Sequence, residues 1–333
     1  MKKNKLNVAV IGVGNMGRHH ARVYHENKNV NLVAIVDIDK EKREHYSNIY
    51  NCKNYKSSRE LIRHEYIDAV SIAVPTNKHY EVASTCIDAK IDCLVEKPIA
   101  HTISEAKKIY NLAKKNKVKL TIGHIERYNP AIVNLKKIIY QGQLGDIITI
   151  SSRRLGLPPL NKKDIGVILD IGIHDIDIIC DLLSEEPEKI YTLKGNKHTK
   201  KNLDYAQMLL SFKKGVSASI EANWLIPTKI RQLTVTGTRG YAEIDYLTQR
   251  LRIFKINKPA SSYKTYKEFI SKFSTPDYQD IEFPKAEPLV AEIQNFINYS
   301  QNKTAYLVTP QEAIRALKIA LLASTMHKTM VRL

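Results

Sequence analysis

Three side chains of this 333-residue chain have the chemistry and the spacing needed to move a proton. Asp170 and His174 are four residues apart, so a helical turn would place both on one face. A carboxylate oriented against an imidazole forms a workable general base. Lys97 lies just past an apolar run, residues 92–95, where its ammonium group would favour the alkoxide form of a bound hydroxyl. Each residue also has a possible structural role: Asp170 as an N-cap carboxylate, His174 as a capping or core histidine, and Lys97 as a surface lysine before a turn.

A glycine-rich turn near the N-terminus has the spacing of a dinucleotide site. The sequence Gly-Val-Gly-Asn-Met-Gly at residues 12–17 follows an apolar run and leads into a helical stretch, which is the context of the Gly-x-Gly-x-x-Gly fingerprint. Gly12 allows the tight turn, Gly14 lets the backbone approach a pyrophosphate, and Gly17 lets the helix pack close to the sheet. The residues expected to bind the cofactor here are Gly12, Gly14, Asn15, Met16 and Gly17.

An acidic residue follows this turn at the distance expected for a ribose contact. Asp37 closes the next apolar run, twenty residues past Gly17. Its carboxylate can accept hydrogen bonds from a ribose diol and would repel a 2′-phosphate, so we expect the cofactor to be NAD rather than NADP. Lys40 and Arg43 are close in sequence and would soften that preference.

Composition narrows the class of protein. The formal net charge is +18, but the lysines are spread as pairs along the chain and form no dense block with aromatic residues between them. This pattern indicates a solvated basic surface that suits an anionic substrate and argues against nucleic-acid binding. The four cysteines form no Cys-x-x-Cys pair or zinc spacing, so we expect reduced thiols and no metal. With no leader pattern and no membrane span in the sequence, we expect a cytoplasmic protein.

The first 123 residues alternate strands and helices, which predicts a parallel sheet with right-handed crossovers. Strands are expected at residues 7–12, 32–37, 69–74, 92–95 and 119–123, and helices near 15–27, 39–49, 58–64, 78–89 and 103–116. The hydroxyl of Thr102 and the carboxylate of Glu105 have the spacing of a capping box.

The second half is rich in strands. Asn129-Pro130 is a favourable helix start, and a helix is expected from there to about residue 140. Alternating apolar and polar residues then predict a sheet with one covered face. Its strands are expected at 146–154, 189–195, 204–212, 216–224, 230–236, 241–246 and 250–255. One helix, from about His174 to Leu183, interrupts them, and Asp175 and Asp177 on it are expected to be cap or surface carboxylates.

These patterns predict an α/β Rossmann domain followed by an α+β domain with a large open, mostly antiparallel sheet. We expect the NAD-binding domain to span residues 1–123 and the substrate-binding and oligomerisation domain to span 124–308. The second includes an irregular excursion at 256–285 and a helix at 287–300. Residues 309–333 begin with a capping box and carry small residues on one face, so we expect a C-terminal helix that packs at the domain junction.

Taken together, these motifs resemble the Gfo/Idh/MocA oxidoreductase family over nearly the whole chain. The resemblance rests on the glycine turn, Asp37, residues 74–79, Glu96-Lys97-Pro98 and the Asp-x-x-x-His at 170–174. It implies that Lys97, Asp170 and His174 are catalytic, with the lysine assisting proton movement and the histidine acting as acid and base. The further cofactor residues that it implies are Pro75, Thr76, Asn77, His79, Glu96 and Lys97. It also implies a homodimer or homotetramer formed through the open sheet.

A finer resemblance concerns the substrate. Residues 123–130 and 287–289 resemble a subgroup that oxidises the 3-hydroxyl of UDP-N-acetylglucosamine before transamination to a 3-amino sugar. The residues then expected to bind the substrate are Lys97, Arg127, Asn129, Asp170 and His174. The guanidinium of Arg127 suits phosphate or sugar oxygens, and a structural ion pair is its alternative role. Alternative activities are dehydrogenation of UDP-N-acetylglucosaminuronate, inositol or a simple sugar, and a non-catalytic, NAD-responsive regulator is a second alternative.

Overall fold

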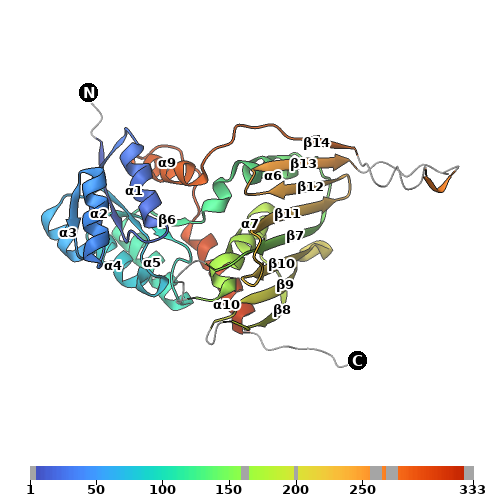
Figure 1. The fold of residues 1–333 in the computed structure, drawn as a ribbon, viewed down its shortest axis with the longest axis horizontal. Helices are drawn as coiled ribbons and strands as arrows, with labels where there is room; N and C mark the ends of the chain where they lie inside the picture. Colours follow the sequence, from blue (N-terminus) through green and yellow to red (C-terminus); the bar gives the residue numbers. More distant parts are fainter. Residues whose placement is uncertain (1–4, 159–164, 199–201, 256–264, 268–276, 326–333) are drawn as a thin grey trace. The chain divides into compact units, whose positions relative to one another are not determined.

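The computed structural model describes residues 5–158, 165–198, 202–255, 265–267 and 277–325. The chain divides into two compact units (Figure 1). The first contains the residues up to 128 together with residues 287–321, and the second contains most residues from 129 to 286 and those after 321. Among the described residues, no helix is long and apolar enough to cross a membrane.

The first unit is built on a six-stranded parallel sheet. Its strands are β1 Leu6–Ile11, β2 Val30–Val36, β3 Lys53–Tyr55, β4 Ala69–Ile72, β5 Asp92–Glu96 and β6 Leu120–Gly123. They are ordered β3-β2-β1-β4-β5-β6, the order of a dinucleotide-binding sheet, and this confirms the predicted Rossmann domain. Strand β3 was not predicted, because this edge strand has only three residues and they are polar or aromatic and not buried.

Helices connect these strands close to their predicted bounds. They are α1 Gly17–Glu26, α2 Lys40–Tyr50, α3 Ser58–His64, α4 His79–Asp88 and α5 Ile103–Asn116, with the short 3-10 turns η1 Thr76–Lys78 and η2 Ile125–Tyr128. Local hydrogen bonds explain several helix starts. The capping box of α5 is confirmed, since the Thr102 hydroxyl accepts from the backbone N–H of Glu105 and the Glu105 carboxylate accepts from that of Thr102.

Two helices from the end of the chain also belong to the first unit. Helix α9, Pro288–Ser300, was expected in the second domain, but it packs beside α1 (Figure 1). The physical reason is its apolar face, since Leu289, Ile293 and Phe296 are buried in the same core as strands β1 and β2. Helix α10, Pro310–Thr325, follows, and its residues up to 321 are part of this unit. Its packing at the domain junction stays a prediction, and residues 326–333 lie outside the described part.

The second unit contains the predicted open, mostly antiparallel sheet. Its strands are β7 Ile147–Leu155, β8 Lys189–Gly195, β9 Tyr205–Ser211, β10 Ser217–Asn223, β11 Ile230–Gly237, β12 Gly240–Asp245, β13 Arg250–Lys255 and β14 Tyr278–Asp280. Their order is β14-β13-β12-β11-β7-β10-β9-β8, and only β7 and β10 pair in parallel. Strand β14 lies within the stretch predicted to be irregular, and most of that stretch, 256–264 and 268–276, lies outside the described residues.

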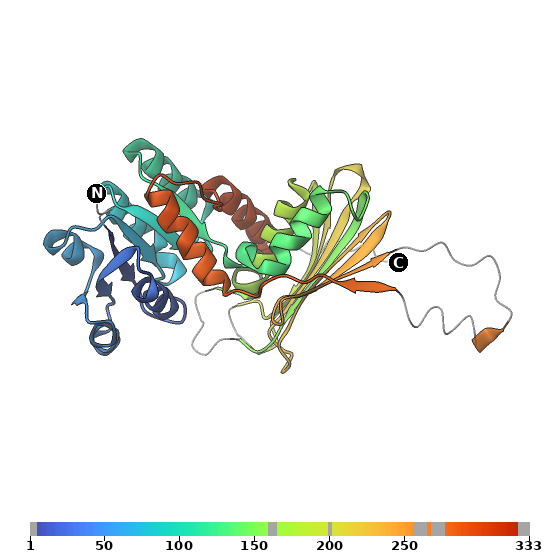
Figure 2. The same ribbon diagram turned by 90° about the horizontal axis from the view of Figure 1, so that it is seen from above.

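Helices cover one face of this sheet, as its alternating pattern predicts. Helix α6, Pro130–Tyr140, packs on β12 and β13, and α7, Ile173–Leu183, packs on β7 and β10 (Figure 2). Every second residue of β9 and β10 is buried, which is the burial expected of a sheet with one covered face. The π-helical turn η3, Ile168–Gly172, runs directly into α7, and a short 3-10 turn, η4 Lys213–Gly215, joins β9 to β10.

Candidate active site

The first and last glycines of the glycine turn occupy positions that only glycine fits. Gly12 has φ of +88°, and a Cβ on it would lie 2.7 Å from the carbonyl oxygen of Ala73. A Cβ on Gly17 would lie 1.7 Å from the carbonyl oxygen of Gly12. The first glycine therefore makes the turn after β1, and the last lets α1 start against it, as predicted from their spacing.

The middle of the turn is open. Gly14 and Asn15 are exposed, and a Cβ on Gly14 would meet nothing within 4 Å. Helix α1 has no side-chain cap and no acidic residue in its first turn, so its unpaired N–H groups and positive dipole end are not neutralised by the chain itself. This arrangement fits a bound pyrophosphate.

Asp37 joins the end of β2 to the glycine turn. Its Oδ2 accepts the backbone N–H of Val13 at 2.8 Å, and its Oδ1 accepts that of Asp39 at 2.9 Å. The carboxylate is half-buried beside the turn, where an adenosine ribose would be recognised. The guanidinium of Arg43 donates to the carbonyl oxygen of Ile38 at 3.3 Å, so this nearby cation is held against the backbone.

His79 fastens two loops at the carboxyl edge of the sheet. Its Nδ1 lies 2.8 Å from the carbonyl oxygen of Pro98, and its Nε2 lies 2.9 Å from that of Val74. The ring is buried, and burial lowers the pKa of His79 although the two carbonyl contacts act in the opposite direction. The structure shows it as a brace between the loops after β4 and β5. Its contact with the cofactor stays a prediction, as do those of Pro75 and Asn77, which are exposed in the first of these loops, and Thr76, which is buried there.

Glu96 and Lys97 end strand β5 at the same edge. Parallel strands place their carboxyl ends together, so Lys97 is at the edge from which the glycine turn also leaves. The buried Glu96 carboxylate contacts His20 through Oε1 at 3.0 Å, and its Oε2 accepts the backbone N–H of Lys97 at 3.2 Å. Lys97 is half-buried, and its peptide bond to Pro98 is cis. The predicted catalytic lysine is therefore held by its neighbour in the motif.

Arg127 forms an ion pair within the first unit. It is 2% exposed in η2, and its Nη1 donates to Oε1 of Glu312 at 2.8 Å. Burial acts to raise the pKa of Glu312, but the charge and hydrogen bond of Arg127, with the bonds from Thr309, outweigh it and lower that pKa to about 2. Arg127 therefore forms the structural ion pair that was named as the alternative to substrate binding. A contact between Arg127 and substrate stays a prediction.

Asn129 is a helix cap at the start of the second unit. Its Oδ1 accepts the backbone N–H of Ala131 at 3.1 Å, and its Nδ2 donates to the carbonyl oxygen of Tyr246 at 3.2 Å. The side chain is buried. Asn129 therefore starts α6, as its position before Pro130 predicts, and its expected substrate contact stays a prediction.

Asp170 and His174 lie on the helical segment that crosses the second sheet. Asp170 is in the π-helical turn η3 and is 3% exposed, while His174 is half-buried in the first turn of α7. A Cβ on Gly172, between them, would lie 3.2 Å from Cε of Met208 on the sheet. The glycine therefore lets the π-helical turn lie close to β9, and such turns occur often at functional sites. Lys97 belongs to the first unit and this pair to the second.

A second ion pair, which the sequence pattern did not predict, anchors α7. The guanidinium of Arg154 on β7 donates from Nε and Nη2 to the carboxylate of Asp175 at 2.8 and 3.0 Å, and both residues are buried. Arg154 also lies over the ring of Tyr246, 4.8 Å from its centroid. The expectation that Asp175 and Asp177 are cap or surface carboxylates is wrong, because both are on the buried side of α7. The sequence signal that could have indicated this ion pair is the position of Arg154 on the inward face of an alternating strand.

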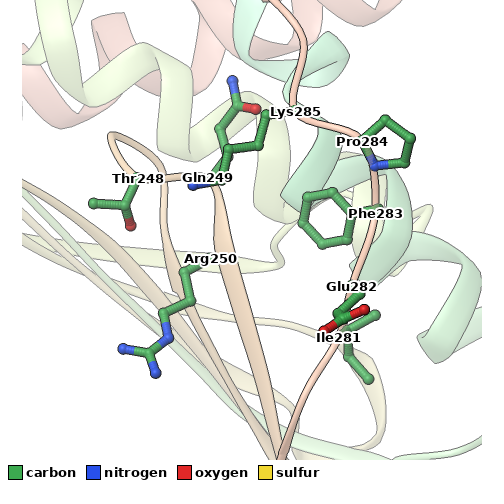
Figure 3. Close-up of a pocket in the computed structure, with 8 residues that line it drawn as sticks. All are labelled: Thr248, Gln249, Arg250, Ile281, Glu282, Phe283, Pro284 and Lys285. Atoms are coloured by element: carbon green, nitrogen blue, oxygen red, sulfur yellow. The ribbon is translucent and has the colours of Figure 1, made fainter.

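A surface pocket of the second unit contains none of the predicted site residues. It has a volume of about 750 Å³ and lies between Thr248, Gln249 and Arg250 on one side and residues 281–285 on the other (Figure 3). Arg250 pairs with Asp280 at 2.9 Å. The pocket is beside β13, near one edge of the eight-stranded sheet, whereas Asp170 and His174 are on the segment that packs on β7 and β10.

Comparisons with known proteins match both halves of the chain to one family. Residues 6–124 match the oxidoreductase family with an NAD-binding Rossmann fold, and residues 132–243 match the GFO/IDH/MocA C-terminal domain. The chain belongs to the GFO/IDH/MocA family. It is an oxidoreductase of sugars or polyols, and NAD is its cofactor.

Individual relatives span most of the chain. UDP-N-acetylglucosamine 3-dehydrogenase of Acidithiobacillus ferrooxidans is 29% identical over 295 residues, which are 88% of each chain. Myo-inositol 2-dehydrogenase of Thermotoga maritima is 30% identical over 226 residues, 65% of this chain and 68% of that protein. The solved structure of UDP-N-acetylglucosamine 3-dehydrogenase GnnA from Acidithiobacillus ferrooxidans superposes with a TM-score of 0.83 at 26% identity, covering 96% of this chain and 97% of that one.

Proposed function

We propose that this enzyme oxidises the 3-hydroxyl of a nucleotide sugar, UDP-N-acetylglucosamine, to its 3-keto form, which a transamination then converts to a 3-amino sugar. The proposal is carried by a chain-long similarity to an enzyme named for this reaction, at 29% identity over 88% of both chains, together with Lys97 at the carboxyl end of β5. The net charge of +18 supports a substrate that carries a pyrophosphate.

Each catalytic side chain has a role that its environment supports. His174, oriented by the buried carboxylate of Asp170, takes the proton of the sugar hydroxyl. The ammonium of Lys97, held at the sheet edge through Glu96, stabilises the developing alkoxide. NAD, when bound, would supply the hydride acceptor. The glycine turn and Asp37 would hold it by its pyrophosphate and ribose, so that positioning would contribute much of the rate.

The decisive experiment is a substrate screen. NADH formation from NAD is followed with UDP-N-acetylglucosamine, UDP-N-acetylglucosaminuronate and myo-inositol, with hydroxylamine to trap a ketone and mass spectrometry to locate it. A trapped 3-keto product from UDP-N-acetylglucosamine alone supports the proposal. Turnover only with the uronate or inositol replaces the substrate and keeps the catalytic residues. Stoichiometric NAD binding without turnover of any sugar would favour a non-catalytic regulator.

A matched pair of variants tests the catalytic pair itself. His174→Gln and Asp170→Asn keep the side-chain size but remove the base and the group that orients it, so kcat is expected to fall by about 10²–10⁴-fold with NAD affinity unchanged. Asp177→Asn, three residues after His174 in α7, is the control, because it changes another buried carboxylate of the same helical segment. Equal loss in all three would indicate a structural effect.

We also propose that the enzyme is a homodimer or homotetramer formed through the open face of the eight-stranded sheet. Large apolar side chains are exposed there on neighbouring strands, and Tyr191 on β8 is paired directly with Leu209 on β9. Both side chains are more than half exposed. Clusters of large, exposed apolar side chains are uncommon on monomeric proteins and often mark an interface. Light scattering on the wild type and on Leu209→Lys measures the assembly, and a monomeric wild type would contradict it.

A further inference from the structure

Three buried ionisable side chains of the first unit meet directly behind Lys97. His20 comes from α1, Glu96 from the end of β5, and Glu292 from α9. Their exposed fractions are 0%, 6% and 1%, and one nitrogen or oxygen atom of each lies within 4.8 Å of the others. The proposed reaction uses neither His20 nor Glu292, so the burial of both beside a motif residue needs a physical explanation.

Two of the three groups are satisfied by a continuous chain of hydrogen bonds. His20 Nε2 lies 3.0 Å from Glu96 Oε1, its Nδ1 lies 3.0 Å from the Ser71 hydroxyl, and that hydroxyl lies 2.9 Å from the phenol oxygen of Tyr24. An ionised Glu96 can only accept, so Nε2–H donates to it. With a neutral ring, Nδ1 then accepts from Ser71 and Ser71 accepts from Tyr24. This series of hydrogen bonds ends at Glu96, whose other carboxylate oxygen accepts the backbone N–H of Lys97.

Glu292 is different, because neither of its carboxylate oxygens has a hydrogen-bond partner among the described residues. Burial, followed by the charge of Glu96, raises the pKa of Glu292 well above its ordinary value. Burial also disfavours the Glu96 carboxylate, but the hydrogen bond from His20 and the charge of Lys97 outweigh it and lower the pKa of Glu96. Burial raises the pKa of Tyr24, so this phenol keeps its proton. The pKa values of the two carboxyl groups in the cluster are therefore shifted in opposite directions.

We propose that Glu292 is a neutral carboxylic acid and a positioning residue: by staying uncharged next to Glu96, it leaves Glu96 as the anion that holds the backbone of Lys97. The positioning role rests on the proposed function, in which Lys97 handles the alkoxide. Histidine and carboxylates are also the ligand types of a metal site. In the proposed state His20 Nε2 donates to Glu96 and a protonated Glu292 balances the charge, so this state requires no cation.

The first test measures stability against pH. The folded-state pKa of Glu292 lies above its unfolded value of 4.5, so the folded protein holds a proton that the unfolded chain releases. Stability therefore falls as the pH rises from about 4.5 to the folded pKa. Glu292→Gln has the shape of the neutral acid and no proton to lose. Relative to this variant, the folding equilibrium constant of the wild type is expected to fall about tenfold for each pH unit in that range, measured by urea unfolding.

Two control variants bracket this result. Glu312→Gln removes a carboxylate whose pKa is lowered, so its effect should have the opposite sign and lower stability at neutral pH. Glu41→Gln changes an exposed carboxylate and should match the wild type throughout. A pH dependence in Glu292→Gln identical to that of the wild type would overturn the proposal.

The second test follows the proton and the reaction. Infrared spectra of the wild type should contain the carbonyl stretch of a protonated carboxyl group that is absent from Glu292→Gln. In turnover, Glu292→Gln should keep kcat at neutral pH and hold it to higher pH, because the wild type loses the Glu96–Lys97 geometry when Glu292 ionises. Absence of the infrared band, an unmoved alkaline limb, or zinc at one equivalent per chain that disappears in the variant would overturn the assignment. The infrared and unfolding measurements need no substrate, so they decide the state of Glu292 even if the substrate screen fails.

Discussion

The carboxylate of Glu96 accepts a hydrogen bond from the backbone N–H of Lys97, with 3.2 Å between Oε2 and the nitrogen. The two residues are neighbours in the chain, but one side chain is buried in the core and the other is half-buried at the edge of the sheet. Since the other oxygen of Glu96 is bonded to His20, the turn that presents the lysine is tied to helix α1. The lysine is thereby positioned by the same helix whose start forms the cofactor turn.

Replacing Lys97 should separate catalysis from cofactor binding. Lys97→Met removes the ammonium and keeps most of the stem, so kcat is expected to fall by about 10²–10⁴-fold while the affinity for NAD stays within a few-fold. Steady-state rates and a calorimetric titration with NAD measure the two effects. Lys115→Met, an exposed lysine at the end of α5, is the control. Loss of NAD binding together with turnover would point to misfolding.

Asp37 should set the choice between NAD and NADP. Asp37→Asn keeps an oxygen that can accept the N–H of Val13, but it removes the charge that would repel a 2′-phosphate. The ratio of kcat/KM for NAD to that for NADP is expected to fall by about tenfold or more. Asp39→Asn, at the cap of α2, serves as the control because it changes the same charge two residues away. An unchanged ratio would show that the ribose is recognised elsewhere.

The ion pair of Arg127 and Glu312 should make the free energy of unfolding fall at acid pH. The pKa of Glu312 is about 2 in the folded protein, below its unfolded value of 4.5, so its contribution is present above about pH 4.5 and is lost as the pH falls toward 2. Glu312→Gln is expected to cost about 1–3 kcal/mol at neutral pH, less than for a fully buried pair because the carboxylate is 27% exposed. Urea unfolding at neutral and acid pH measures it, and a cost that persists at low pH would contradict the assignment.

Breaking the ion pair of Arg154 and Asp175 should be more damaging. Both groups are buried, so Asp175→Asn removes a negative charge that lies 2.8 Å from the guanidinium and is expected to cost about 3–5 kcal/mol. The double variant Arg154→Met/Asp175→Leu removes both charges and should recover much of that loss. Thermal unfolding of Arg154→Met, Asp175→Leu and the double variant completes the cycle. Additive losses would show that the two residues do not act as a pair.

Much of the fold could be predicted because its signals are local. Gly12 is favoured by its own positive φ and Gly17 by the carbonyl of Gly12 five residues earlier, and the capping box of α5 closes within four residues. The alternation of β9 and β10 likewise predicts which side of the sheet is covered. Edge strand β3 and strand β14 were missed, since short exposed strands of three residues carry no apolar pattern.

The sequence by itself determined the dinucleotide fingerprint and the presence of Lys97, Asp170 and His174, because these depend on residue type and spacing along the chain. Only the tertiary structure decided that α9 joins the first unit and brings Glu292 to His20 and Glu96. A glutamate between apolar residues of a helix is ordinarily assigned to the solvent side. Its burial depends on which apolar faces meet in the folded chain, and this is a long-range outcome of packing that no local pattern contains.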